Sequence, residues 1–154
     1  MKTIASNKRA RFDYDITDTV VAGLVLLGSE VKSIKNGLVS IKGSYVRFVD
    51  GEPMLTGSHV SPYPPAGELK QHEPERDRKI LLNKNEIQKI KSERQNGHHI
   101  IPTKIGVVDR FVKLELGIGT ARKKYDKREV IKKREAQRQI ARVKKNLGQI
   151  NNRV

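Results

Sequence analysis

The sequence predicts a mainly β fold, a small closed or nearly closed antiparallel barrel with two or three peripheral helices, followed by a basic tail. Apolar segments of strand length, separated by hairpin turns and two helical segments, recur through residues 1–120. The last 34 residues, 121–154, instead hold 13 of the 32 Lys and Arg and only 3 of the 17 Asp and Glu. We therefore expect one domain over residues 1–120 and a tail over residues 121–154.

Apolar runs bounded by turn-forming residues indicate five or six strands. The clearest pair flanks Asp50-Gly51, a dipeptide that accepts the positive φ angles of a tight hairpin turn. In the last strand apolar and polar side chains alternate, so one face is expected in the core and Phe111, Lys113 and Glu115 on the other. The predicted strands are 11–16, 22–28, 41–49, 53–60, 99–107 and 111–118.

Two helices are expected between these strands. Ser29 is predicted to cap the first helix, over residues 30–35. Asn83 is predicted to cap a second helix of about three turns, because Glu86 follows it at the spacing of a capping box. Residues 61–77 are rich in proline and charge, so they are expected to form a long exposed loop.

The tail changes to a helical period. Apolar residues recur at spacings of 4, 3 and 4, at Ala136, Ile140, Val143 and Leu147. Cations cover the other faces, at Lys132, Lys133, Arg134, Arg138, Arg142, Lys144 and Lys145. Because like charges repel along a helix, we expect the tail to be disordered alone and to fold on a partner.

The charge of the chain points to a polyanionic partner. The formal net charge is +15, and the tail supplies +10 of it. Membrane-binding helices usually present large apolar side chains opposite their cations, whereas the tail from residue 126 contains neither Trp nor Phe. Nucleic acid is therefore favoured over an anionic membrane surface.

Missing residue types exclude several other classes. Without cysteine the chain has no disulfide, no thiolate metal site and no cysteine nucleophile. It also lacks the apolar stretch of a secretory signal and any run near the ~20 apolar residues of a membrane span. We expect a cytoplasmic protein that does not bind membranes.

The first candidate RNA contact lies near the N-terminus. Lys8, Arg9 and Arg11 stand beside Phe12 and Tyr14. Cations and aromatic rings in this combination hold single-stranded and looped nucleotides, so phosphate contact by the cations is predicted. The alternative is a solvated basic segment whose aromatic residues begin a core strand.

A second candidate lies before the helix at Asn83. Arg78 and Lys79 offer cations, and Asn83 offers an amide that is also the expected helix cap. Both roles of Asn83 are compatible with each other. Leu81 is expected in the core on composition alone.

A third candidate opens the tail. An aromatic ring, a carboxylate and two cations follow one another at Tyr125, Asp126, Lys127 and Arg128, a combination suited to stacking on a base while binding the backbone. Read alone, Asp126 is a helix N-cap instead. The preceding Arg122 and Lys123 are also expected to contact RNA.

No pattern indicates catalysis or a metal site. His98 and His99 are adjacent and would point to opposite faces of a strand. Asp13 and Asp15 would alternate on one strand face and suggest a metal-dependent nuclease, but no general base or lysine follows at a motif spacing. We expect that the protein is not an enzyme and that it binds neither a metal nor a cofactor.

Four motifs stand in an order typical of one family: Asn7-Lys-Arg-Ala-Arg11, Gly28-Ser-Glu-Val-Lys-Ser33, Arg78-Lys-Ile-Leu-Leu-Asn83 and Tyr125-Asp-Lys-Arg-Glu129. Over residues 7 to about 145 the chain closely resembles the small protein B family, the tmRNA-binding proteins of bacterial trans-translation. It departs from the family's usual acidic residue, glycine and large aromatic residue at Val21, Ala121 and Ala136, respectively.

This resemblance implies an adaptor rather than an enzyme. Family members have a barrel related to the oligonucleotide-binding fold and a tail that is disordered in solution. They bind the tRNA-like domain of tmRNA, travel with elongation factor Tu to a stalled ribosome and occupy its decoding center, while the tail becomes helical in the empty mRNA channel. A monomer is expected. The alternative is a structural ribosomal protein, which would share the small barrel and the basic tail.

Carried over by position, the resemblance implies particular contacts. Residues 125–128 would enter the decoding center, and residues 131–145 would form the channel helix. The tmRNA contacts would be made by Asn7, Leu81, Asn83 and Lys113.

Overall fold

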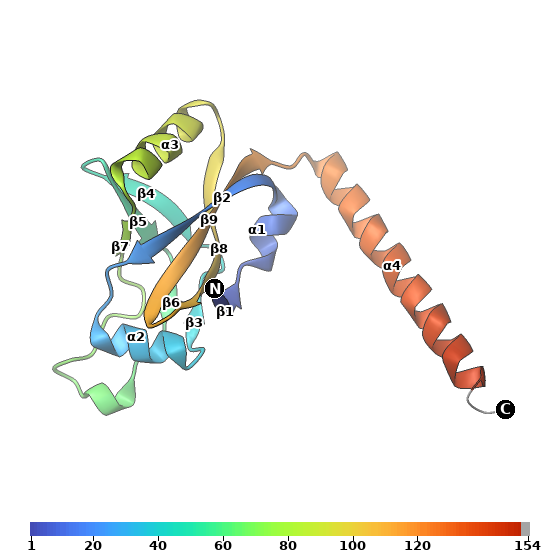
Figure 1. Ribbon diagram of the computed structural model, residues 1–154, viewed down its shortest axis with the longest axis horizontal. Coiled ribbons are helices and arrows are strands. Elements are labelled where there is room, and N and C mark those ends of the chain that lie inside the picture. The colour runs from blue at the N-terminus through green and yellow to red at the C-terminus, as the bar shows by residue number, and fades with distance from the viewer. Residues whose placement is uncertain (152–154) are drawn as a thin grey trace. The chain divides into compact units, whose positions relative to one another are not determined.

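The computed structural model describes the backbone of residues 1–151 and the side chains of residues 1–123 and 127–146. The chain divides into two units, which meet between Ala121 and Arg122 (Figure 1). The first unit, the body, holds all the strands of the described chain. The second holds the long helix α4, Lys124–Asn151.

The elements of the body follow a mostly β order. Its strands are β1 (Lys2–Ser6), β2 (Tyr14–Leu24), β3 (Val39–Ser40), β4 (Tyr45–Val49), β5 (Glu52–Thr56), β6 (His59–Val60), β7 (Arg78–Leu81), β8 (His99–Val108) and β9 (Phe111–Ala121). Its helices are α1 (Lys8–Asp13), α2 (Gly28–Lys35), the short 3-10 helix η1 (Pro64–Ala66) and α3 (Lys84–Gln95).

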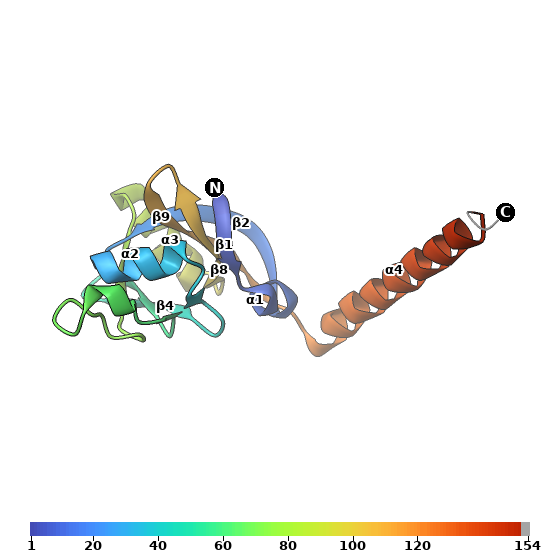
Figure 2. The same cartoon turned by 90° about the horizontal axis from the view of Figure 1, so that it is seen from below.

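Seven strands form one antiparallel sheet in the order β1-β8-β9-β2-β7-β5-β4, and β3 pairs separately with β6. The outer strands β1 and β4 do not pair with each other within the described residues, so the sheet is not closed. The predicted mainly antiparallel fold is confirmed, whereas a fully closed barrel is wrong. Helices α2 and α3 lie at opposite ends of the sheet (Figures 1 and 2).

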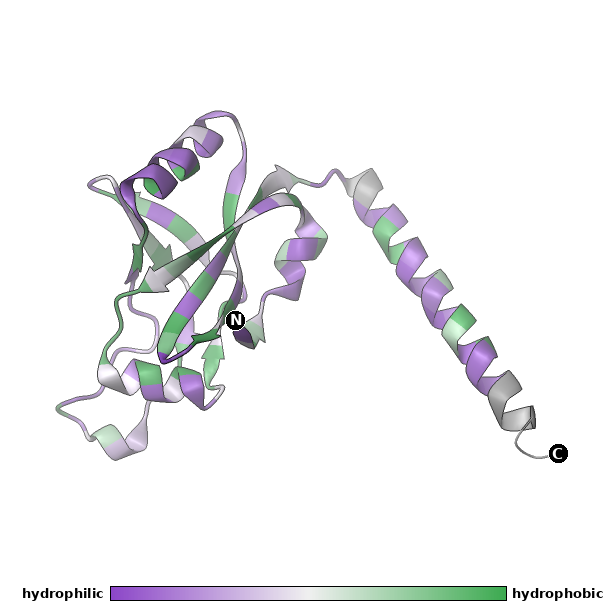
Figure 3. Cartoon of the chain, viewed as in Figure 1, coloured by the Kyte–Doolittle hydropathy of each residue, from purple (hydrophilic) through white to green (hydrophobic). Residues whose placement is uncertain are grey.

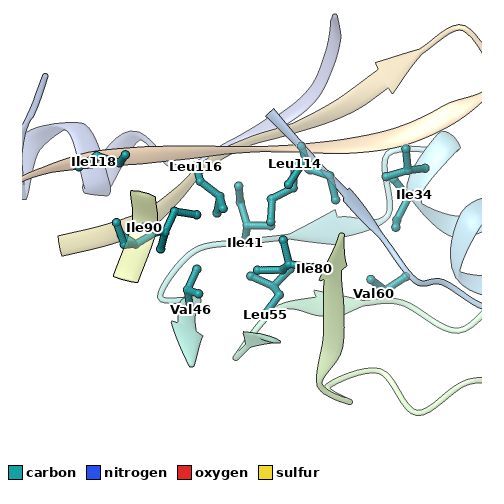
Figure 4. Close-up of a cluster of buried hydrophobic side chains, with 14 residues drawn as sticks. Ile34, Ile41, Val46, Leu55, Val60, Ile80, Ile90, Leu114, Leu116 and Ile118 are labelled. Carbon is teal, nitrogen blue, oxygen red and sulfur yellow. The ribbon is translucent and has the colours of Figure 1, made fainter. Parts of the chain in front are cut away.

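The core lies between the two halves of this sheet. Leu114 and Leu116 of β9 face Leu55 of β5 and Ile80 of β7, and all four side chains are at most 1% exposed (Figure 4). Ile90 of α3 is also completely buried. One sheet that packs against itself therefore encloses a single core, because both of its halves turn their apolar faces inward.

Local sequence signals predicted three features of the fold correctly. The hairpin between β4 and β5 turns at Asp50 and Gly51, whose φ angles are +52° and +80°. Asn83 caps α3, and its side-chain oxygen accepts a hydrogen bond from the Glu86 amide at 2.8 Å. The alternation in β9 also holds, since Val112 and Leu114 are buried.

Two predictions at the N-terminal side are wrong. Residues 11–13 belong to helix α1, because Asn7 caps this helix and accepts a hydrogen bond from the Ala10 amide at 3.2 Å. Helix α2 begins at Gly28 after Leu27, and Ser29 does not cap it. The Ser29 hydroxyl instead lies 2.8 Å from Nδ1 of the buried His72.

The predicted exposed loop over residues 61–77 is anchored in part. His72 is 4% exposed, and its Nε2 lies 2.9 Å from the carbonyl oxygen of Val60. Arg76 reaches the carboxylate of Glu30. In contrast, Leu69 is fully exposed. Polar side chains that enter the interior therefore fix the ends of a segment whose middle faces solvent.

The tail contains the predicted helix. Helix α4 has 28 residues, and its residues 127–146 are mostly hydrophilic (Figure 3). Ile140 and Val143 of the predicted apolar stripe are 56% and 57% exposed, and Leu147 lies outside the described side chains. Folding of this helix only on a partner stays a prediction. Among the described residues, no helix combines the length and apolar character needed to cross a membrane.

Candidate RNA-binding surface

A buried ion cluster joins two of the family-like motifs. Glu30 of α2 accepts hydrogen bonds from two arginines. Arg76 donates to its Oε1, and Arg78 of β7 donates to its Oε2. The side chains of Glu30 and Arg78 are 0% and 1% exposed. Arg78 also donates to Oγ of Ser58 at 2.9 Å and to the carbonyl oxygen of Pro74 at 3.1 Å. The cluster therefore fastens α2, β7 and the end of the 61–77 segment together.

Two opposing effects act on the pKa of Glu30. Burial alone raises this pKa, but hydrogen bonds from Arg76, the Leu27 amide and Arg78 outweigh burial and hold it below its usual value. Glu30 is therefore charged at neutral pH. A buried carboxylate in this state requires its two arginines, because an isolated charge in the interior is costly.

This burial corrects the expected role of Arg78. A guanidinium group with 1% exposure and four protein partners faces the interior, not an RNA surface. Sequence reasoning placed it outside because arginine is rarely buried unless paired. Its partner, Glu30, is 48 residues away in the sequence, and no local signal links the two.

Asn7 also points inward. It is 5% exposed, and its amide nitrogen donates to the carbonyl oxygens of Pro102 at 3.2 Å and Ile41 at 3.4 Å. Together with its capping bond to α1, these contacts use both ends of the amide. The side chain is therefore not at the surface, as direct RNA contact would require; it positions α1 against β8.

Helix α1 presents the predicted N-terminal cations. Lys8, Arg9 and Arg11 are all exposed. Nε of Arg9 lies 3.3 Å from a carboxylate oxygen of Asp13, and Nη2 of Arg11 lies 3.7 Å from a carboxylate oxygen of Glu115. The two arginine side chains are 69% and 53% exposed, so their remaining N–H groups are accessible to phosphates.

The outer face of the sheet brings three strands together. Gly23 of β2 is paired with Leu81 of β7 on one side and Lys113 of β9 on the other. A Cβ atom at Gly23 would lie 3.3 Å from Cβ of Leu81 and 3.8 Å from Nζ of Lys113. The absence of a side chain at Gly23 therefore leaves room for a leucine and a lysine to meet across β2. Phe111 continues this surface, with Nζ of Lys113 at 6.0 Å from its ring centroid.

We name Gly23, Leu81, Phe111 and Lys113 the sheet-face patch. Leu81 is 48% and Phe111 is 68% exposed, which is unusual for large apolar side chains. Val21 also lies on this face, paired with Glu115 and 50% exposed. Leu81 and Lys113 were expected here from the family resemblance, whereas Gly23 and Phe111 were missed. The alternation in β9 already put Phe111 on the face of Lys113 and was the available signal.

The remaining candidates lie beside the patch or in the tail. Asn83 is exposed two residues after Leu81, so capping and RNA contact remain compatible. Lys123 is exposed and Arg122 half-buried, while the side chains of Tyr125 and Asp126 lie outside the described residues. In α4, exposed side chains include Arg128, Lys132, Lys133, Arg134, Arg138, Arg142, Lys144 and Lys145, and Lys127 is half-buried.

The expectation that Asp13 and Asp15 lie on one strand face is wrong. Asp13 ends α1 and Asp15 lies in β2, so they do not alternate along one strand. Among the described side chains, no group of three or more metal-ligating residues is present.

A family model described as SmpB protein matches residues 4–146. The chain belongs to the SmpB protein family. The SsrA-binding protein of Enterococcus faecalis (strain ATCC 700802 / V583) is 45% identical over 146 residues, which cover 94% of each chain. That of Geobacillus thermodenitrificans (strain NG80-2) is 47% identical over 142 residues, covering 92% of this chain and 91% of the relative.

A solved structure also resembles this chain. It belongs to work titled "tmRNA-SmpB: a journey to the center of the bacterial ribosome" and is 36% identical, with a TM-score of 0.63. The match covers 82% of this chain and 93% of the solved one. Membership of the SmpB family therefore rests on sequence and on fold together.

Proposed function

We propose that this chain is a tmRNA-binding adaptor in trans-translation, the rescue of stalled ribosomes. Its relatives are SsrA-binding proteins, and it spans more than nine-tenths of their length. In this proposal the body binds the tRNA-like domain of tmRNA, and the protein delivers it to the ribosome together with elongation factor Tu. It acts as a monomer in the cytoplasm.

The sheet-face patch carries the proposal. An exposed leucine and phenylalanine beside a lysine offer apolar contact to an unstacked base and charge to its phosphate. The exposed cations of α1 supply further phosphate contacts. The partly open, curled sheet that presents the patch is, in this proposal, a relative of the oligonucleotide-binding barrel.

The basic tail has a separate role in the proposal. Residues 125–128 contact the decoding center, with Arg122 and Lys123 at their entrance, and residues 131–145 lie as a helix in the vacant mRNA channel. The exposed cations of α4 support this role, because a helix in such a channel meets phosphates on every side. In the absence of the ribosome the tail is disordered.

Catalysis is not part of the proposed function. The adaptor works through positioning and charge and requires neither metal nor cofactor. Incubation of tmRNA with the protein and Mg²⁺ or Mn²⁺ should leave the RNA intact. Metal-dependent cleavage of the RNA would contradict the adaptor function and indicate a nuclease.

Salt dependence provides the main test. With about six cations on phosphates, tmRNA affinity should fall by orders of magnitude between about 50 and 200 mM salt. Filter binding over this range measures it, and an affinity that hardly changes would contradict the proposal. Recovery of the protein only with ribosomes stalled without a stop codon supports the adaptor, whereas its presence on every translating ribosome would favour a structural ribosomal protein.

Truncation tests the proposed division of labour. Deletion of the residues after Glu129 removes most of α4, so it should abolish peptide tagging on stalled ribosomes and leave tmRNA affinity nearly unchanged. Tagging assays and filter binding on the same preparation separate the two functions. A large loss of tmRNA affinity would make the tail a tmRNA-binding element.

A further inference from the structure

A second polar site lies on the body, away from the sheet-face patch. It is a cavity of about 370 Å³ between α1, the turn before β4, and the segment that joins α3 to β8. Its polar and aromatic lining includes Arg9, Asp13, Tyr14, Tyr45, Arg94 and His99. None of these residues belongs to the sheet-face patch, and Tyr14 begins β2 whereas Gly23 of the patch lies near its end, so the two sites are separated along this strand.

Two guanidinium groups at this cavity are held by aromatic rings. The guanidinium of Arg94 lies 4.9 Å from the ring centroid of Phe48, and that of Arg9 lies 5.7 Å from that of Phe12. Such stacking uses the flat face of a guanidinium, while the N–H groups along its edge can still donate hydrogen bonds. The cavity therefore has two cations that lie over aromatic rings of the body.

Aromatic rings line the same cavity. The rings of Tyr14 and His99 are 5.2 Å apart and tilted by 55°. Tyr45 projects from the start of β4 and is 53% exposed. An exposed ring at the mouth of a cationic cavity provides a flat apolar surface on which a base can stack.

The floor of the cavity is fixed by internal hydrogen bonds. The Ser44 hydroxyl donates to the carbonyl oxygen of Ile41 at 2.5 Å, and Asn7 donates to the same oxygen at 3.4 Å. Gly43 has a φ angle of +75°, a conformation that disfavours any side chain at this position. Internal hydrogen bonds therefore hold the turn before β4 in place on this side of the cavity.

The charges of the lining favour an anion. Among the described lining residues Asp13 supplies the one carboxylate, and it is paired with Arg9. His98 also lines the cavity and is paired with Glu93, which does not. Within the part of the chain that the structure describes, neither carboxylate forms an ion pair with Arg94, which therefore adds a positive charge to the lining.

We propose that this cavity binds an unpaired nucleotide of an RNA, with the phosphate at Arg94 and the base against Tyr45. The volume suits a ligand of this size, since small-molecule sites begin at about 300 Å³. This site goes beyond the proposed function, because it gives the body a second RNA contact that does not use the sheet-face patch. The nucleotide comes either from tmRNA or from ribosomal RNA.

A titration with mononucleotides tests the site directly. Addition of GMP or AMP to the ¹⁵N-labelled full-length protein should shift the amide signals of residues 43–46 and 98–101. Arg94→Gln and Tyr45→Ala should each weaken this binding by about tenfold, as expected for one charge-assisted or one stacking contact. Both side chains are exposed, so the fold should survive, and an unchanged melting temperature verifies it.

A control variant tests whether the loss of GMP binding is specific to the cavity. Arg110→Gln removes an exposed arginine outside the cavity and should leave GMP binding unchanged. No amide shift at residues 43–46 and 98–101, an equal loss in Arg110→Gln, or equal affinity for inorganic phosphate would each overturn the proposal. This readout does not depend on tmRNA, so its failure is distinct from failure of the proposed function.

Two binding assays then identify the source of the nucleotide. Weaker tmRNA binding by Arg94→Gln and Tyr45→Ala would assign the nucleotide to tmRNA. Normal tmRNA binding with weaker association to stalled ribosomes would assign it to ribosomal RNA. If both variants retain full affinity in both assays, the cavity is not an RNA site.

Discussion

The motif at residues 78–83 contributes to two regions with opposite character. At its start, Arg78 is 1% exposed and bound to Glu30, whereas three residues later Leu81 is 48% exposed on the sheet-face patch. A charged residue is thus inside and an apolar residue outside, the reverse of the usual distribution. The buried Arg78 is therefore expected to stabilise the fold, and the exposed Leu81 is available for binding. Conservative changes at the two positions should therefore affect different measurements.

The largest expected effect is on stability, at Arg78. Arg78→Met removes one partner of a buried ion pair and leaves Glu30 with one arginine, which should lower the free energy of unfolding by about 3–5 kcal/mol. Urea denaturation measures this loss. Arg47→Met is the matched control, because Arg47 is 52% exposed and pairs with Asp77 at 2.5 Å. The control should cost no more than about 1 kcal/mol.

Equal losses in these two variants would contradict the distinction between the regions. A folded Arg78→Met protein should also retain its tmRNA affinity, because the guanidinium does not reach the surface. A strong loss of tmRNA affinity without a loss of folding stability would indicate that Arg78 contacts RNA after all.

The next effect is a pH dependence that arises from the same ion cluster. The pKa of Glu30 is held below its usual value of 4.5, so its contribution to stability is complete above about pH 4.5 and is lost as the pH falls towards the folded-state pKa. Urea denaturation between pH 7 and pH 3 should show this loss. Glu30→Gln should be less stable at pH 7 and should show a smaller fall on acidification. Parallel curves for the two proteins would mean that other carboxylates cause the acid sensitivity.

Sequence reasoning found the elements whose signals are local. The Asp50-Gly51 turn, the Asn83 cap and the alternation in β9 each depend on a few neighbouring residues, and each is present. The burial of Arg78 could not be found in this way, since its partner Glu30 is 48 residues distant. Whether a sheet closes into a barrel likewise depends on whether strands far apart in the sequence pair with each other. Local propensity therefore predicted elements better than it predicted their surroundings.

The candidate site divides in the same way. Lys113 was expected at the surface by alternation and by resemblance, whereas Leu81 was moved outward by resemblance alone. Composition favours a buried leucine. The exposure of Leu81 follows from its pairing with Gly23 near the end of β2, which carries no side chain to cover it. Asn7 is the converse case, because a polar residue in a basic segment is expected outside, and its capping bonds take it inside.

A moderate effect on binding, with little effect on stability, is expected at the sheet-face patch. Leu81→Ala and Lys113→Gln should each lower tmRNA affinity by about tenfold, because the first removes an apolar contact to a base and the second a phosphate contact. Filter binding at fixed salt measures the change. Leu69→Ala and Lys35→Gln are matched controls at exposed positions outside the patch and should bind as the unchanged protein does. If the controls lose as much affinity, the patch is not the tmRNA site.

The smallest effect is expected at Gly23, which joins the two halves of the patch. In Gly23→Ala the new Cβ lies 3.3 Å from Cβ of Leu81, so Leu81 must move by a few tenths of an ångström. We expect a loss of tmRNA affinity of only a few-fold, with a stability change below about 1 kcal/mol. Gly28→Ala is the control, because nothing lies within 4 Å of a Cβ atom there. Since this substitution removes no contacting group, a weaker complex would indicate that the spacing between Leu81 and Lys113 matters for binding; an affinity equal to that of Gly28→Ala would show that the two side chains act independently.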